Sequence, residues 1–208
     1  MWFDGEDSKS GAGTHEPLIT DPMATVTLQQ VWEDMPRVNG LPLRADLDPL
    51  ALGPLIQDCF IATRIAPGMA RLRVAGRNLG RYTGTEARGL PLSVLFDNAD
   101  RAELMRCLEM CFAEPALLDL PVEAATGLGK PPLGGRLMLL PMRDGMGHVT
   151  KALGGLFVSG RVGRGVRRFR FDAALPKRKL PISAAAAAAE SRRTGGRPAL
   201  RLVVNNDT

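Results

Sequence analysis

The sequence contains few of the residues that metal and cofactor chemistry uses. It has three cysteines and two histidines in 208 residues, and aromatic residues make up 5% of the chain. Cys59, Cys107 and Cys111 are too few and too scattered for a disulfide framework, so we expect reduced thiols that pack in the core. His15 and His148 lie far from them in sequence, and a structural metal site needs about four converging ligands. The sequence therefore predicts no metal site.

Long apolar segments are also absent. No stretch approaches the roughly 20 apolar residues that a membrane-spanning helix needs. Residues 1–7 (MWFDGED) become acidic at once and do not lead into the apolar segment of a signal peptide. We therefore expect a cytoplasmic protein with no membrane span. Hydrophobic residues make up 45% of the chain, which is enough for a core built mainly from aliphatic side chains.

Patterns typical of nucleophilic or phosphate chemistry are missing as well. Ser93 and Ser159 lack the flanking glycines of a nucleophile elbow. The glycine-rich stretches 127–130 and 160–165 do not have the spacing of a phosphate-binding loop. Asp46 and Asp48 are better explained by an ion pair and by a helix cap than by acid–base catalysis. The sequence predicts no catalytic residue and no enzyme.

Charge is distributed unevenly along the chain. The formal net charge is +5, but residues 161–208 carry twelve Lys and Arg against three Asp and Glu, a net of +9. Residues 1–160 therefore have a net charge of −4. Such a basic block is usually a solvated extension, and the alternative is attraction to an acidic partner. We expect a disordered leader at 1–24, a domain at 25–171 and a basic, low-complexity, disordered tail at 172–208.

The order of the expected elements indicates an α+β fold. The expected helices are 25–35, 49–56 and 98–114, the last capped by Asp97, with shorter helical pieces at 77–82 and 91–96. The expected strands are 59–65, 70–75, 116–124, 135–140 and 148–158, with one last strand at 166–171. Two strands first and three adjacent strands last favour one five-stranded antiparallel sheet with helices packed on one face, plus an N-terminal amphipathic helix.

Three stretches of the sequence carry a family resemblance. Trp32 lies on the first expected helix, and residues 41–49 follow it as Leu-Pro-Leu-Arg-Ala-Asp-Leu-Asp-Pro. Residues 71–76 read as a strand that runs into a glycine, and residues 84–92 (GTEARGLPL) as a glycine-containing loop. Together with the element order, these stretches resemble PAS domains, in particular a bacterial stand-alone subfamily with a Trp-bearing helix followed by Leu-Pro-x-Arg-x-Asp-Leu-Asp-Pro. The likeness covers about residues 26–160.

This resemblance implies a sensory module and leaves its cofactor unknown. PAS domains that bind haem often use a histidine on the long helix, and residues 98–114 contain none. The flavin-binding light-sensing branch resembles Asn-Cys-Arg-Phe before that helix, whereas residues 92–96 read LSVLF. Haem and flavin are therefore disfavoured.

We expect a non-catalytic sensory or regulatory module that binds a small ligand or a protein partner. Its output would go to a signalling protein in trans, and the amphipathic N-terminal helix would pair in a homodimer through Leu28, Val31 and Trp32. Aliphatic side chains would line a small ligand cavity between sheet and helices: Leu72, Val74, Leu79, Leu104, Leu108 and Leu139. The alternative function is a nucleic-acid- or acidic-partner-associated protein that acts through the basic tail.

Overall fold

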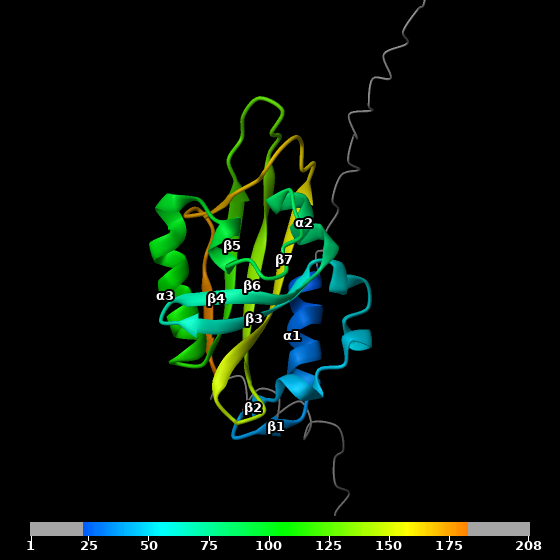
Figure 1. The fold of residues 1–208 in the computed structure, drawn as a ribbon, viewed down its shortest axis with the longest axis vertical. Helices are drawn as coiled ribbons and strands as arrows, with labels where there is room; N and C mark the ends of the chain where they lie inside the picture. The colour runs from blue at the N-terminus through cyan, green and yellow to red at the C-terminus, as the bar shows by residue number, and fades with distance from the viewer. Residues whose placement is uncertain (1–22, 183–208) are drawn as a thin grey trace, which may run out of the picture.

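The computed structural model describes residues 23–182, and these residues fold around one antiparallel sheet (Figure 1). The strand order is β4-β3-β7-β6-β5-β8, and β9 also pairs with β5. The strands are β3 (Cys59–Ala66), β4 (Met69–Ala75), β5 (Ala116–Ala124), β6 (Leu133–Arg143), β7 (Val149–Gly160), β8 (Phe169–Phe171) and β9 (Arg178–Pro181). A separate ribbon is formed by β1 (Arg37–Val38) and β2 (Leu41–Pro42).

The helices are short and lie between the strands as expected. They are α1 (Ala24–Asp34), α2 (Arg77–Thr83) and α3 (Arg101–Phe112), with 3-10 helices η1 (Arg44–Asp46), η2 (Pro49–Gln57), η3 (Leu92–Leu95) and η4 (Asn98–Asp100). The predicted cap of η2 is confirmed, because the Asp48 carboxylate accepts a hydrogen bond from the Leu50 backbone N–H at 2.9 Å. None of the helices in residues 23–182 is long and apolar enough to cross a membrane.

Both faces of the sheet are buried, each under its own set of helices. Phe60 and Ala62 of β3 pack with α2, α3 and η3 on one face, while Cys59 and Ile61 pack with α1 and η2 on the other. A strand covered on both faces has no polar side to present to water. This explains the continuous apolar runs in β3, β6 and β7. Figure 1 shows the β3–β4 hairpin crossing β5, β6 and β7, so the sheet is strongly curled.

The N-terminal helix α1 is part of the domain core. Leu28 and Trp32 are fully buried against the sheet. The Trp32 indole N–H donates to the Pro141 carbonyl at 2.9 Å, and the Arg37 guanidinium lies 4.4 Å from the ring centroid. The apolar stripe that the sequence suggested for a dimer contact therefore packs within the protomer, which corrects the expected exposure of Leu28 and Trp32. Val31 is partly buried.

The sheet continues past the residues expected to end the domain. β8 pairs with β5 through Val122–Ala124, and β9 pairs with β5 through Ala116–Asp119. β8 lies at the expected last strand, but β9 lies within the stretch expected to be a tail. Residues 167–182, which include both strands, are called the C-terminal strap below. Residues 1–22 and 183–208, which hold the rest of the expected leader and tail, lie outside the described residues.

Candidate functional site

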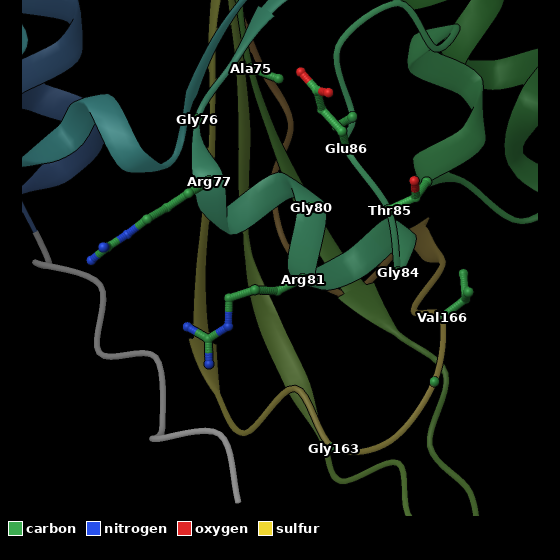
Figure 2. Close-up of a pocket in the computed structure, with 12 residues that line it drawn as sticks. Ala75, Gly76, Arg77, Gly80, Arg81, Gly84, Thr85, Glu86, Gly163 and Val166 are labelled. Atoms are coloured by element: carbon green, nitrogen blue, oxygen red, sulfur yellow. The ribbon is translucent and has the colours of Figure 1, made fainter. Parts of the chain in front are cut away.

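A hollow that is larger than the two others described below lies between α2 and the loop that precedes the C-terminal strap. It has a volume of about 720 Å³ and is called the arginine cleft below. One wall comes from residues 75–87 and the other from residues 163–166, two parts of the chain that are far apart in sequence (Figure 2). The lining residues are Ala75, Gly76, Arg77, Gly80, Arg81, Gly84, Thr85, Glu86, Ala87, Gly163, Gly165 and Val166.

Two glycines set the position of α2 in this cleft. A Cβ atom on Gly76 would collide with the carbonyl oxygens of Gln57 and Ile56, so only glycine lets the start of α2 approach η2 this closely. Gly84 ends the helix in the left-handed conformation, with φ +73° and its N–H bonded to the Gly80 carbonyl at 2.9 Å. The short helix is therefore fixed at both ends.

Arg77 and Arg81 are one helical turn apart and project to the same side of α2, away from Glu86 (Figure 2). The Arg77 Nε–H donates to the Gln57 side-chain oxygen at 3.0 Å, which fixes one edge of its guanidinium. Arg77 is exposed and Arg81 is half-buried. Residues four apart on a helix share a face, so the local sequence Arg-Asn-Leu-Gly-Arg alone places both cations together.

The half-buried carboxylate of Asp58 interacts with the charges of the two arginines. Asp58 accepts a hydrogen bond from the Asn78 side-chain amide at 2.8 Å. Burial raises the pKa of Asp58, while the Asn78 hydrogen bond and then the charges of Arg81 and Arg77 oppose that rise. Asp58 is thus a counter-charge to both arginines.

The strap contacts α2 directly after the second wall of the cleft. The Arg167 backbone N–H donates to the Tyr82 carbonyl at 2.8 Å, and the rings of Tyr82 and Phe169 meet edge to face at 5.2 Å. The Tyr82 hydroxyl is buried and has no hydrogen-bond partner within residues 23–182. Burial, and secondarily the charge of Asp58, raises its pKa well above the usual range. The cleft wall at residues 163–166 therefore leads directly into the first residue of the strap, Arg167, and Arg167 is also where the strap contacts α2.

Comparison with known proteins gives the family. A family model described as PAS domain matches residues 20–157. The chain belongs to the PAS domain family. No curated protein matches it in sequence. One similar solved structure, "Structure of an RNA-binding Light-Oxygen-Voltage Receptor", has 18% sequence identity and a TM-score of 0.37. The similarity covers 76% of this chain and 41% of that chain, so the PAS domain spans less than half of the receptor's length.

The family and the sheet confirm the predicted PAS-like α+β fold. The sheet has seven strands and helices on both faces, which corrects the expected five strands with helices on one face. PAS domains are generally sensory and not catalytic. The narrower subfamily, with its Trp-bearing helix and Leu-Pro-x-Arg-x-Asp-Leu-Asp-Pro stretch, stays a prediction, as does the expectation against haem and flavin.

The six residues expected to line a ligand cavity do not share one hollow of this PAS domain. Leu104 and Leu108 line a hollow of about 230 Å³ between α3 and the β3–β4 turn. Val74 is 50% exposed and lines a different apolar groove, of about 220 Å³, beside η2. Three side chains are fully buried in the core and line none of these three hollows: Leu72, Leu79 and Leu139.

The different position of Val74 has a local cause. Strict alternation would place Leu72 and Val74 on the same face of β4. The register shifts between Ile61 and Ala62, which pair with Val74 and Leu72, so Arg73 is an extra residue in β4. An extra residue reverses the facing of the side chains beyond it. Val74 therefore faces the groove on the Ile61 side of the sheet.

The cysteines are buried in the core, as the sequence suggested. Burial raises the pKa of Cys59 to about 12 and the pKa of Cys107 to about 11. The Cys111 thiol is fully buried, and its pKa is also raised. Thiols held in the neutral form are weak nucleophiles and weak metal ligands. Residues 23–182 contain no group of three or more His, Cys, Asp or Glu side chains that could hold a metal ion.

Most cations of the basic block at residues 161–208 that fall within the described residues contact the domain itself. Three of them form ion pairs at 2.8 to 2.9 Å: Lys177 with Glu103, Lys179 with Glu114, and Arg170 with Glu123. Arg167 is buried and donates to the carbonyls of Val162, Ala125 and Pro131. The acidic partner of these cations is thus the PAS domain, and the alternative of nucleic-acid binding stays a prediction for residues 183–208.

Proposed function

We propose that this PAS domain is a non-catalytic sensory or regulatory module whose ligand or partner binds in the arginine cleft. Binding there changes how the C-terminal strap packs on the domain. The observation that carries the proposal is the composition of the cleft walls: α2 forms one, and the other is formed by residues 163–166, which continue directly into the strap.

The connection between cleft and strap is short. Val166 lines the cleft and is 40% exposed, and the next residue, Arg167, is bonded to the Tyr82 carbonyl. Phe169, which follows Val166 by three residues, packs on the Tyr82 ring. A molecule that moves the two walls apart must alter these contacts. A ligand shifts a conformational equilibrium only if it binds the two states with different affinity, and a cleft between separable walls meets that requirement.

The end of the strap is held by interactions that are individually weak. β9 has four residues, and its neighbourhood is held by the Lys177–Glu103 and Lys179–Glu114 ion pairs at the surface. Exposed ion pairs contribute about 0–1 kcal/mol each. A perturbation at Val166 that reaches these ion pairs would therefore raise the fraction of molecules in which β9 is detached from β5. Release of β9 would expose the edge of β5 at Ala116–Asp119 to a signalling partner in trans.

A variant that fills the cleft tests the proposal without knowledge of the ligand. Val166→Trp places a large side chain at the cleft wall, and we expect faster amide hydrogen exchange at residues 178–181 than in the wild type. The matched control is Val26→Trp, because Val26 is 52% exposed on α1 and lines none of the three hollows. Equal exchange at 178–181 in both variants and the wild type would refute the coupling of cleft and strap.

A further inference from the structure

We propose that the arginine cleft binds a small polyanion that carries phosphate groups. This inference rests on the proposed function, because it names the chemical class of the cleft's ligand. It follows from the donors in the cleft, the charges around it, its size and its lack of aromatic side chains.

The first argument is the geometry of the donors. Arg77 and Arg81 project to the same side of α2, one turn apart, and the hydrogen bond to Gln57 fixes one edge of Arg77. A guanidinium presents a rigid fork of N–H donors that matches two oxygens of a phosphate or carboxylate. Two such groups at neighbouring positions can contact adjacent phosphate groups of one ligand.

The second argument is the glycine-rich lining. Gly80, Gly84, Gly163 and Gly165 line the cleft, and the last three adopt positive φ angles of +73° to +74°. At Gly165 nothing lies within 4 Å of the place a Cβ atom would take, so a ligand can approach the main chain closely there. Thr85, which is exposed in the same lining, adds a hydroxyl donor.

The third argument is the balance of charge around the cleft. Lys130, Arg161 and Arg164 are exposed, and their side chains make no hydrogen bond or ion pair within residues 23–182. Their loops adjoin the cleft wall, since the Arg164 N–H donates to the Gly129 carbonyl at 2.8 Å and Gly163 packs against Pro131. Two cations thus line the cleft and three lie on loops that adjoin it, against Glu86 in the lining and the half-buried Asp58. Such an excess attracts anions to the site.

The fourth argument separates a small molecule from a nucleic-acid strand. Sites for single-stranded nucleic acid stack bases on aromatic side chains, and the twelve lining residues include none. A volume of about 720 Å³ lies within the range of about 300–1,000 Å³ that is typical of small-molecule sites. The chemistry therefore favours recognition of phosphate groups over recognition of bases.

The test is calorimetric titration of the full chain with inorganic pyrophosphate at low and high salt. The double variant Arg77→Gln/Arg81→Gln should weaken binding about 10- to 100-fold, as expected when hydrogen bonds to a charged group are lost. Arg81→Lys should lose less affinity than Arg81→Gln, because the charge remains while the fork is lost. Asp58→Asn should tighten binding, because it removes a competing carboxylate.

The matched control is Arg73→Gln, since Arg73 is an exposed arginine on β4 that does not line the cleft. Its affinity for pyrophosphate should equal that of the wild type. Absence of binding by the wild type, or equal losses in the double variant and the control, would overturn the inference. If pyrophosphate binding fails in this way, altered amide exchange at residues 178–181 in Val166→Trp would still support the proposed function. Unaltered exchange would reject the proposed function too.

Discussion

Two sets of cations in this PAS domain have different surroundings. The six Lys and Arg side chains between residues 167 and 179 all have partners in the domain: acidic side chains, a glutamine or backbone carbonyls. The cations around the arginine cleft include Lys130, Arg161 and Arg164, whose side chains make no such contact within residues 23–182. The first set attaches the strap to the domain, whereas Lys130, Arg161 and Arg164 remain available to a ligand.

This contrast shows that a basic stretch of sequence need not be a binding tail. The net charges of +9 for residues 161–208 and −4 for residues 1–160 suggest a solvated extension or, as the alternative, an acidic partner. Within the described residues, three of the basic side chains of the strap form ion pairs with carboxylates of the domain instead. The predictions below test the two sets separately, in order of decreasing effect.

The largest effect is expected at Arg167. Its side chain is 1% exposed and donates to three carbonyls from two loops. Arg167→Met should lower the free energy of unfolding by about 3 kcal/mol or more, because buried acceptors left without a donor cost about 1–3 kcal/mol each. Urea unfolding measures this loss. Arg161→Met, at an exposed arginine six residues earlier, should change stability by less than about 0.5 kcal/mol. Similar losses in both variants would remove the distinction between the two sets.

A second effect concerns the glycine that positions α2. Gly76→Ala should lower the free energy of unfolding by about 1–3 kcal/mol, because the new Cβ meets backbone oxygens that cannot move aside cheaply. The control is Gly145→Ala, where nothing lies within 4 Å of the added Cβ. Thermal unfolding of both variants checks this prediction, and a harmless Gly76→Ala would mean that α2 is not fixed against η2.

A smaller, pH-dependent effect is expected at Glu103. Hydrogen bonds from Lys177 and then Arg106 lower the pKa of this carboxylate below 4.5. A depressed carboxyl pKa stabilises the fold at pH values above its unfolded pKa, and this contribution is lost as the pH falls through the folded pKa. Glu103→Gln should therefore cost less than about 1 kcal/mol at pH 7, since the pair is partly exposed, and progressively less as the pH falls below 4.5. A difference from wild type that is independent of pH would contradict this assignment.

The smallest effect is expected at Tyr82. Because its buried hydroxyl has no hydrogen-bond partner within residues 23–182, Tyr82→Phe should leave stability unchanged or raise it by up to about 1 kcal/mol. Phenylalanine keeps the edge-to-face contact with Phe169, whereas Tyr82→Leu removes it and should be destabilising. A clear loss of stability in Tyr82→Phe would show that the hydroxyl does have a partner.

Much of the fold was predictable because its signals are local. The cap that Asp48 forms ahead of Pro49, for example, acts over a few residues. Strand β5 was predicted with its observed bounds, 116–124. The expected exposure of α1 was wrong because an amphipathic stripe shows that a helix buries one face, but not whether it packs on its own sheet or on a second copy.

The site was less predictable because it forms from distant segments. The arginine pair at residues 77 and 81 is visible in the sequence, but its neighbours at 163–166 come together with it only through the fold. The bulge that turns Val74 to the other face and the pairing of β9 with β5 also depend on contacts across the sheet. No periodicity within one segment records such contacts.

The coupling of the arginine cleft to the strap is tested most directly by a double-mutant cycle on the free energy of unfolding. The cycle combines Val166→Trp with the pair Lys177→Met/Lys179→Met. If filling the cleft loosens β9, the ion pairs contribute less in the Val166→Trp background, and the combined loss should be smaller than the sum by about 0.5 kcal/mol or more. Losses that add within error would show that the cleft and the strap are independent, and would contradict the account.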